Sequence, residues 1–162
     1  MSGRRCWKGR CSIEKLDEFF LETLRQWVCK AENDLKAAVL SLRAGRECPT
    51  DTVCFHAQQC VEKYQKAFLV LKVIDFPKTH DLKLLARLSP EPLMALLSDE
   101  ERRRLTRYAI VVRYPGEDGE ISLAEARRAV RLARQVRSAI RKLLPRAALR
   151  GRKKERNAPR RG

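Results

Sequence analysis

The chain has 162 residues, of which 44% are hydrophobic, so it is long and apolar enough for one domain with a core. Its uncharged apolar runs are too short to cross a bilayer, so no membrane-spanning helix is expected. Lysine and arginine number 36 against 20 acidic residues, a net charge of +16. Residues 122–162 hold 15 cations and 2 anions, a net of +13, so the basic character lies in the C-terminal part. Such a segment would attract phosphate-rich polymers, although a solvated arginine-rich surface explains the same composition.

The N-terminal half predicts two long helices after a polar extension. Residues 1–18 lack periodicity and are expected to be loosely ordered. Apolar residues three and four apart then predict a helix over residues 19–44, which Gly45 ends. The second helix is expected to begin at a cap formed by Thr50 or Asp51 and to continue to about residue 73.

Shorter helices are predicted in the middle of the chain. Thr79 is expected to cap a helix that ends near residue 88, and Pro90 to begin another short one. Ser98 and Glu101 have the spacing of a capping box, which predicts a helix from there to about residue 113.

The final helix is predicted to begin at a second capping box, Ser122 to Glu125, and to end at Pro145. Residues 146–162 are too polar and charged to fold alone and are expected to be a disordered basic tail. No segment alternates like a strand. The predicted fold class is therefore all-α, an antiparallel up-and-down bundle of four to five helices over residues 19–145.

Six cysteines are present, but none forms a C-x-x-C pair, and only two histidines accompany them. A zinc site is therefore not expected. No signal peptide is apparent at the N-terminus, and the domain does not need covalent staples, which favours reduced thiols in the cytoplasm. Cys29, Cys54 and Cys60 fall within helical apolar patterns and are expected to be buried.

A polar strip follows the second helix, because Gln59, Glu62, Lys63 and Lys66 lie three or four residues apart. Its simplest interpretation is a solvated face with a Glu62–Lys66 pair. His56, one turn earlier, is expected to be a packing residue.

Two further places are candidates for chemistry. His80 at a helix start could act as a general acid or base, or could merely fill the junction. Arg107 and Tyr114 are seven residues apart and so share a helix face, with Arg113 at the helix end. They could hold a phosphate and stack a base. Alternatively, the two arginines close the bundle through ion pairs with Glu62 or Asp81.

Three passages resemble the HEPN family of small helical domains. They are "WVCKAENDLKAAVLSL" at 27–42, "HAQQCVEKYQKAFLVL" at 56–71, and "THDL" at 79–82 together with "RYP" at 113–115. The resemblance spans about residues 20–144 and implies an antiparallel helical bundle that pairs as a two-fold dimer. Many members are encoded beside a minimal nucleotidyltransferase, and some such pairs act as toxin and antitoxin.

The resemblance also implies a site. Active toxins of the family are metal-independent ribonucleases with an arginine, four residues, a histidine and often a tyrosine near the end of the third long helix. By spacing, the arginine is Arg107 and the tyrosine Tyr114, but the histidine position is Val112. Valine cannot transfer a proton, so His80 or Arg113 would have to substitute for the histidine across a dimer cleft. Tyr114 would be the acceptor if the partner transfers adenylate to this motif.

We therefore expect a non-catalytic or weakly catalytic cytoplasmic HEPN protein that pairs with a minimal nucleotidyltransferase. Nucleotide or RNA would bind through Arg107, Arg113, Tyr114 and Lys63. One alternative is a metal-independent endoribonuclease that uses Arg107, Tyr114 and His80. Another is a helical dimerisation module that its basic tail tethers to nucleic acid. No metal, cofactor or membrane contact is expected.

Overall fold

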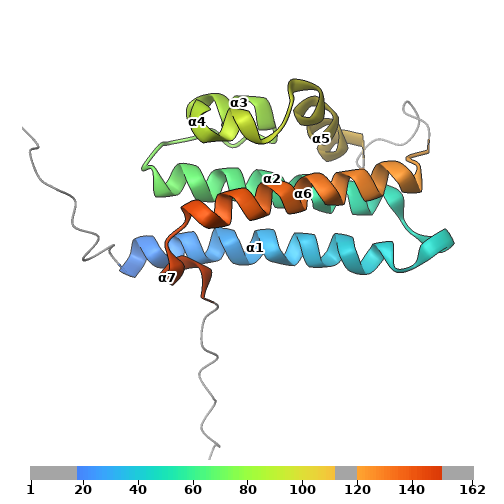
Figure 1. The fold of residues 1–162 in the computed structure, drawn as a ribbon, viewed down its shortest axis with the longest axis horizontal. Helices are drawn as coiled ribbons and strands as arrows, with labels where there is room; N and C mark the ends of the chain where they lie inside the picture. Colours follow the sequence, from blue (N-terminus) through green and yellow to red (C-terminus); the bar gives the residue numbers. More distant parts are fainter. Residues whose placement is uncertain (1–17, 112–119, 151–162) are drawn as a thin grey trace, which may run out of the picture.

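The computed structural model describes residues 18–111 and 120–150, and within these ranges every regular element is helical. The predicted all-α bundle is confirmed. Its long helices lie side by side in Figure 1: α1 (Glu18–Leu42), α2 (Thr50–Leu71) and α6 (Leu123–Leu143). The shorter elements are η1 (Gly45–Glu47), α3 (Leu82–Leu88), α4 (Pro90–Leu93), η2 (Met94–Leu96), α5 (Asp99–Val111) and α7 (Arg146–Leu149).

The four longest helices alternate in direction. α1 and α2 are antiparallel neighbours joined by a short connection (Figure 1). α5 runs opposite to α6, because Gln135 bonds to the carbonyl of Leu96 just before α5 begins, whereas Tyr108 near its end bonds to Glu125. Figure 1 shows that α2 and α6 run in the same direction. The helices α1, α2, α5 and α6 therefore follow the up-and-down order expected from the sequence.

The core lies where α1, α2 and α6 meet. On α1 the buried residues recur three or four apart, as the periodicity predicted; they are Leu24, Val28, Ala31, Leu35 and Ala38. α2 is buried on a broader face because α1, α3, α5 and α6 all contact it. Tyr64 and Phe68 are its largest buried side chains.

Several predicted helix ends differ from the structure. α2 has no side-chain cap at Thr50 or Asp51; Pro49 occupies the N-cap position. α2 ends at Leu71, and the backbone turns through Val73, whose φ of 56° few β-branched residues adopt. Thr79 does not cap α3. That cap is Asp81, whose carboxylate accepts from the amides of Lys83 and Leu84.

The two predicted capping boxes differ from each other. Ser98 and Glu101 bond reciprocally, each side chain to the other's amide. Ser122 also caps α6, but the Glu125 carboxylate bonds instead to the Tyr108 hydroxyl at 2.6 Å. This bond ties the start of α6 to α5.

The expectation of disorder from residue 146 onward is wrong for the first residues of that segment, which form α7. Ala148 is buried in the core, and Leu149 packs against it. No helix in the described ranges is long and apolar enough to span a membrane.

Candidate functional site

A buried polar cluster lies on the face of α2 that meets the α2–α3 connection. We call it the Glu62 cluster, and its members are Gln58, Gln59, Glu62, Lys66 and His80. Glu62 Oε2 accepts from Gln58 Nε2 at 2.9 Å and from Gln59 Nε2 at 3.4 Å. Its Oε1 accepts from Lys66 Nζ at 2.7 Å. Glu62 and Lys66 are only 3% and 7% exposed, so the prediction of a solvated strip is wrong.

Glu62 is held as a carboxylate. Burial alone would raise the pKa of this carboxyl, but the hydrogen bonds from Lys66, Gln58 and His80 together lower it below its usual value. A buried charge with a complete set of donors is stable, whereas loss of any one donor leaves it poorly compensated.

Lys66 joins the cluster to the α2–α3 connection. Besides Glu62, its ammonium donates to the carbonyl of Thr79 at 3.0 Å. It also lies 5.8 Å from the ring centroids of both Trp27 and Phe76, which pack edge to face. The buried Lys66 ammonium on α2 therefore contacts both α1 and the segment before α3.

His80 is the solvent-facing member of the cluster. Its Nδ1 lies 2.9 Å from Glu62 Oε2, while half of its side chain remains exposed. A carboxylate at Nδ1 favours the tautomer with the proton on that nitrogen, which leaves Nε2 as a proton acceptor. The arrangement can do general acid–base chemistry on a bound molecule. Sequence spacing proposed His80 but did not pair it with Glu62.

Lys63 faces α1 instead. Its ammonium pairs with Asp34, and the same carboxylate lies 2.9 Å from His56 Nδ1. This ion pair partly neutralises the charge that Lys63 would offer to an anionic ligand. His56 packs edge to face against the Phe55 ring, as expected, and is also a partner of Asp34 in a polar triad.

Arg107 is exposed on α5. The helix is close to the segment that carries His80, because the amide of Leu82 donates to the Thr106 hydroxyl at 3.2 Å. Val112, Arg113, Tyr114 and Pro115 lie outside the described residues. The structure therefore brings the elements of Arg107 and His80 together, while Arg113 and Tyr114 remain sequence predictions.

A second ionic network joins α1, α2 and α6 around Glu32. This carboxylate accepts from Arg137 at 2.6 and 3.0 Å, from Arg141 at 3.4 Å, and from the Tyr64 hydroxyl. Burial would raise the pKa of Glu32, but the bonds from Arg137 and Tyr64 lower it overall. Two of the arginines of α6 are therefore structural.

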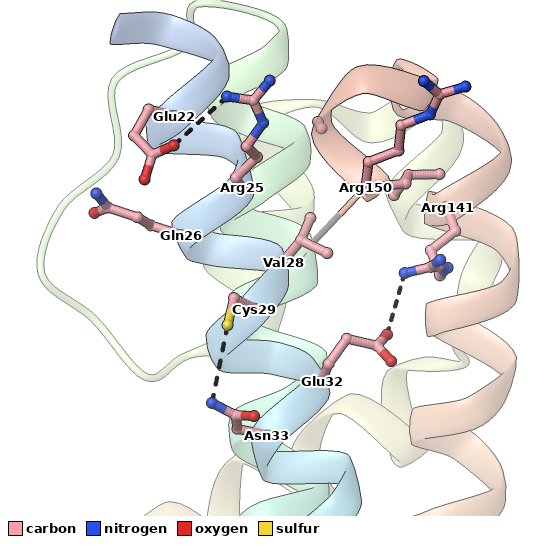
Figure 2. A pocket seen from close by; sticks show the side chains of 11 residues that line it. Glu22, Arg25, Gln26, Val28, Cys29, Glu32, Asn33, Arg141 and Arg150 are labelled. Atoms are coloured by element: carbon pink, nitrogen blue, oxygen red, sulfur yellow. Dashed lines mark hydrogen bonds and ion pairs between the residues drawn. The ribbon is translucent and has the colours of Figure 1, made fainter. Parts of the chain in front are cut away.

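Beside this network is a pocket of about 500 Å³ between α1, the end of α6 and α7. Figure 2 shows Glu22, Arg25, Gln26, Cys29 and Asn33 along α1, with Arg141 and Arg150 opposite. The acidic side chains that line the pocket form ion pairs with arginines: Glu22 lies 3.5 Å from Arg25, and Glu32 lies 3.4 Å from Arg141. Neither His80 nor Arg107 is among the residues that line this pocket.

The described cysteines are free thiols: Cys29, Cys48, Cys54 and Cys60. Cys54 and Cys60 are buried, as predicted, but Cys29 is exposed in the pocket, contrary to the prediction. Burial raises the pKa of Cys54 to about 12. In the part of the chain that the structure describes, no three metal-binding side chains lie close enough to hold an ion.

The comparisons with known proteins agree with the fold. A family model described as the HEPN domain matches residues 24–143. No curated protein and no solved structure matches the chain.

Proposed function

Because the chain belongs to the HEPN family, we propose that it is a non-catalytic or weakly catalytic member that binds nucleotide or RNA beside the exposed face of α5. Arg103 and Arg107 lie one turn apart and are both exposed. The Leu82–Thr106 hydrogen bond carries the proposal, because it holds the segment of His80 against α5 one residue from Arg107. Guanidinium groups are well suited to phosphate.

We further propose that the protein pairs as a dimer and binds a minimal nucleotidyltransferase in a toxin–antitoxin-like pair. The support is family membership. Tyr114, the proposed adenylate acceptor, and Arg113 complete the site. The test is purification of the chain co-expressed with the nucleotidyltransferase encoded beside it, followed by mass spectrometry of the peptide that contains Tyr114. A complex or an adenylated tyrosine supports the pairing, and two separate proteins with unmodified Tyr114 would refute it.

The ligand test is direct titration of the purified full chain with ATP and with a short RNA oligomer. Arg107→Ala is the test variant. Arg87→Ala is its matched control, since Arg87 is also an exposed helical arginine. The loss of one charge-assisted contact to phosphate should weaken binding by about tenfold. Equal affinities of the two variants would exclude α5 as the binding face.

A second function, metal-independent RNA cleavage, is favoured by the Glu62–His80 pair. In such a step His80 Nε2 takes the proton of a ribose 2′-hydroxyl, whose oxygen attacks the adjacent phosphorus. The bond from phosphorus to the 5′-oxygen of the next nucleotide breaks, a 2′,3′-cyclic phosphate remains, and the leaving oxygen takes a proton from water.

The assay for this step is incubation of total RNA with the chain in EDTA. Cleavage that Arg107→Ala and His80→Asn abolish, and that His56→Asn retains, supports the enzyme. If no RNA is cleaved at high protein concentration, the ribonuclease function is refuted and only the binding function remains.

A further inference from the structure

The arginines of α6 fall into two groups that differ in what they contact. Arg128 lies 3.7 Å from Glu101, and Arg137 and Arg141 pair with Glu32. These three lie on the flanks of the helix, toward α5 and α1. The remaining cations of α6 have no carboxylate within 4 Å among the described residues; they are Arg127, Arg131, Arg134 and Lys142.

The second group forms one line on the helix surface, which we call the α6 cationic row. Positions 127, 131 and 134 follow four- and three-residue steps, and Ser138 and Lys142 continue the same face. All five residues are exposed. The opposite face carries Ala126, Val130, Ala133, Val136 and Ile140, all buried in the core. At 1.5 Å per residue the row extends about 22 Å.

We propose that the α6 cationic row is a docking surface for a nucleic-acid backbone, separate from the α5 face. The row presents four cations along about 22 Å, which suits the regularly repeated phosphates of a nucleic-acid strand. Arginine side chains without an internal partner lose no ion pair on binding. The contacts reach only phosphate, so binding is expected to be independent of sequence.

An anionic membrane is the less suitable partner. A helix that lies on a lipid surface inserts its apolar face among the acyl chains. The apolar face of α6 is occupied by the core, and of its large apolar residues only Leu143 is exposed, at 44%. Because the α6 cationic row has no apolar edge, it favours a nucleic-acid backbone over a lipid surface.

The test compares two triple variants of the full chain that lose the same charge. The first is Arg127→Gln, Arg131→Gln and Arg134→Gln. The control is Lys30→Gln, Lys78→Gln and Arg87→Gln, three exposed cations that lie outside α6. The probe is a fluorescent single-stranded RNA of 12 nucleotides, titrated at several salt concentrations.

Each phosphate contact contributes about 0.7 to the slope of log K against log salt for a single strand. The α6 triple should therefore lower the slope by about 2 and weaken RNA binding about 10- to 100-fold at 0.1 M salt. The control should leave the slope close to that of the wild type. Arg→Lys at the same three α6 positions should keep most of the binding, because it keeps the charges.

Equal slopes for the α6 triple and the control would overturn the proposal. If the α6 triple loses binding to phosphatidylserine vesicles but binds RNA like the wild type, the proposal is overturned in favour of a lipid surface.

The inference rests on the proposed nucleic-acid function but fails separately from it. The α6 triple should bind ATP like the wild type, whereas Arg107→Ala should bind ATP weakly. RNA binding lost in the α6 triple, with ATP binding unaffected by Arg107→Ala, would refute the α5 site and retain the row.

Discussion

The Nδ1 atom of His80 lies 2.9 Å from the Oε2 atom of Glu62, although the histidine is half exposed and the glutamate is buried. The pair links solvent to a carboxylate inside the bundle. Lys66 balances that carboxylate from the other side at 2.7 Å. Glu62 is therefore both a structural anchor and the group that orients His80, the most exposed member of the cluster.

Glu62→Gln should strongly destabilise the fold. The amide keeps the shape of the side chain but leaves the Lys66 ammonium buried without a counter-charge, which costs about 3–5 kcal/mol in comparable buried pairs. Urea unfolding followed by circular dichroism measures the change. Adding Lys66→Met to the variant should recover part of the loss. Glu100→Gln, which removes an exposed carboxylate beside Arg103 and Arg104, is the control and should change the midpoint little.

The same carboxylate should make stability depend on acid pH. The folded-state pKa of Glu62 lies below its usual value of 4.5, so its contribution is complete above pH 4.5. The contribution is lost as the pH falls through the lowered folded-state pKa, because protonation breaks the bonds to Lys66 and His80. The free energy of unfolding, measured from pH 7 to pH 3, should fall less steeply for Glu62→Gln than for the wild type. Parallel curves would contradict this assignment.

Glu32 and Asp99 contribute to the same acid loss at other places. Bonds from Lys83 and Arg102 lower the pKa of Asp99 to about 2, and those from Arg137 and Tyr64 lower that of Glu32. Glu62→Gln should therefore remove only part of the fall in unfolding free energy at acid pH.

Local signals account for what the sequence predicted well. The α1 core positions followed from spacing alone, and Ser98 and Glu101 formed the box that their separation indicated. The polar strip of α2 was misjudged because periodicity does not reveal what covers a face. His80 covers Glu62, while the Thr79 carbonyl and the aromatic pair Trp27–Phe76 cover Lys66, and all of these come from other parts of the chain.

The cysteines show the same limit of periodicity. Cys54 and Cys60 are buried as predicted, but Cys29 is exposed in the pocket. Cys29 follows buried Val28 directly, but one residue rotates a side chain about 100° around the helix, enough to bring it to the surface. For α7, composition predicted disorder, yet Ala148 and Leu149 supply enough apolar contact to fix one turn.

Alkylation should therefore distinguish the cysteines of the folded protein. Cys29 is exposed, whereas at pH 8 a buried thiol with a pKa of about 12 is roughly 0.01% thiolate. Iodoacetamide at pH 8 should modify Cys29 within minutes, and Cys54 and Cys60 only after denaturation. Peptide mapping by mass spectrometry reads each site separately. Early modification of Cys54 would show that the α2–α5–α6 contact opens.

Removal of α7 should destabilise the bundle, while removal of the residues after it should not. A chain that ends at Arg150 keeps buried Ala148, the packing of Leu149, and the bond from Arg25 Nε to the Ala147 carbonyl at 3.2 Å. A chain that ends at Pro145 loses all three, a cost of about 1–3 kcal/mol. Thermal and urea unfolding of both chains measure the difference.

Ala148→Asp in the full chain is the matched point variant, because it places a charge in the same buried position without shortening the protein. Its unfolding midpoint should fall close to that of the chain ending at Pro145, since α7 would detach from α1 in both. If both chains and the point variant unfold at the wild-type midpoint, α7 does not contribute to the core, and the domain ends at Pro145 as the sequence alone suggested.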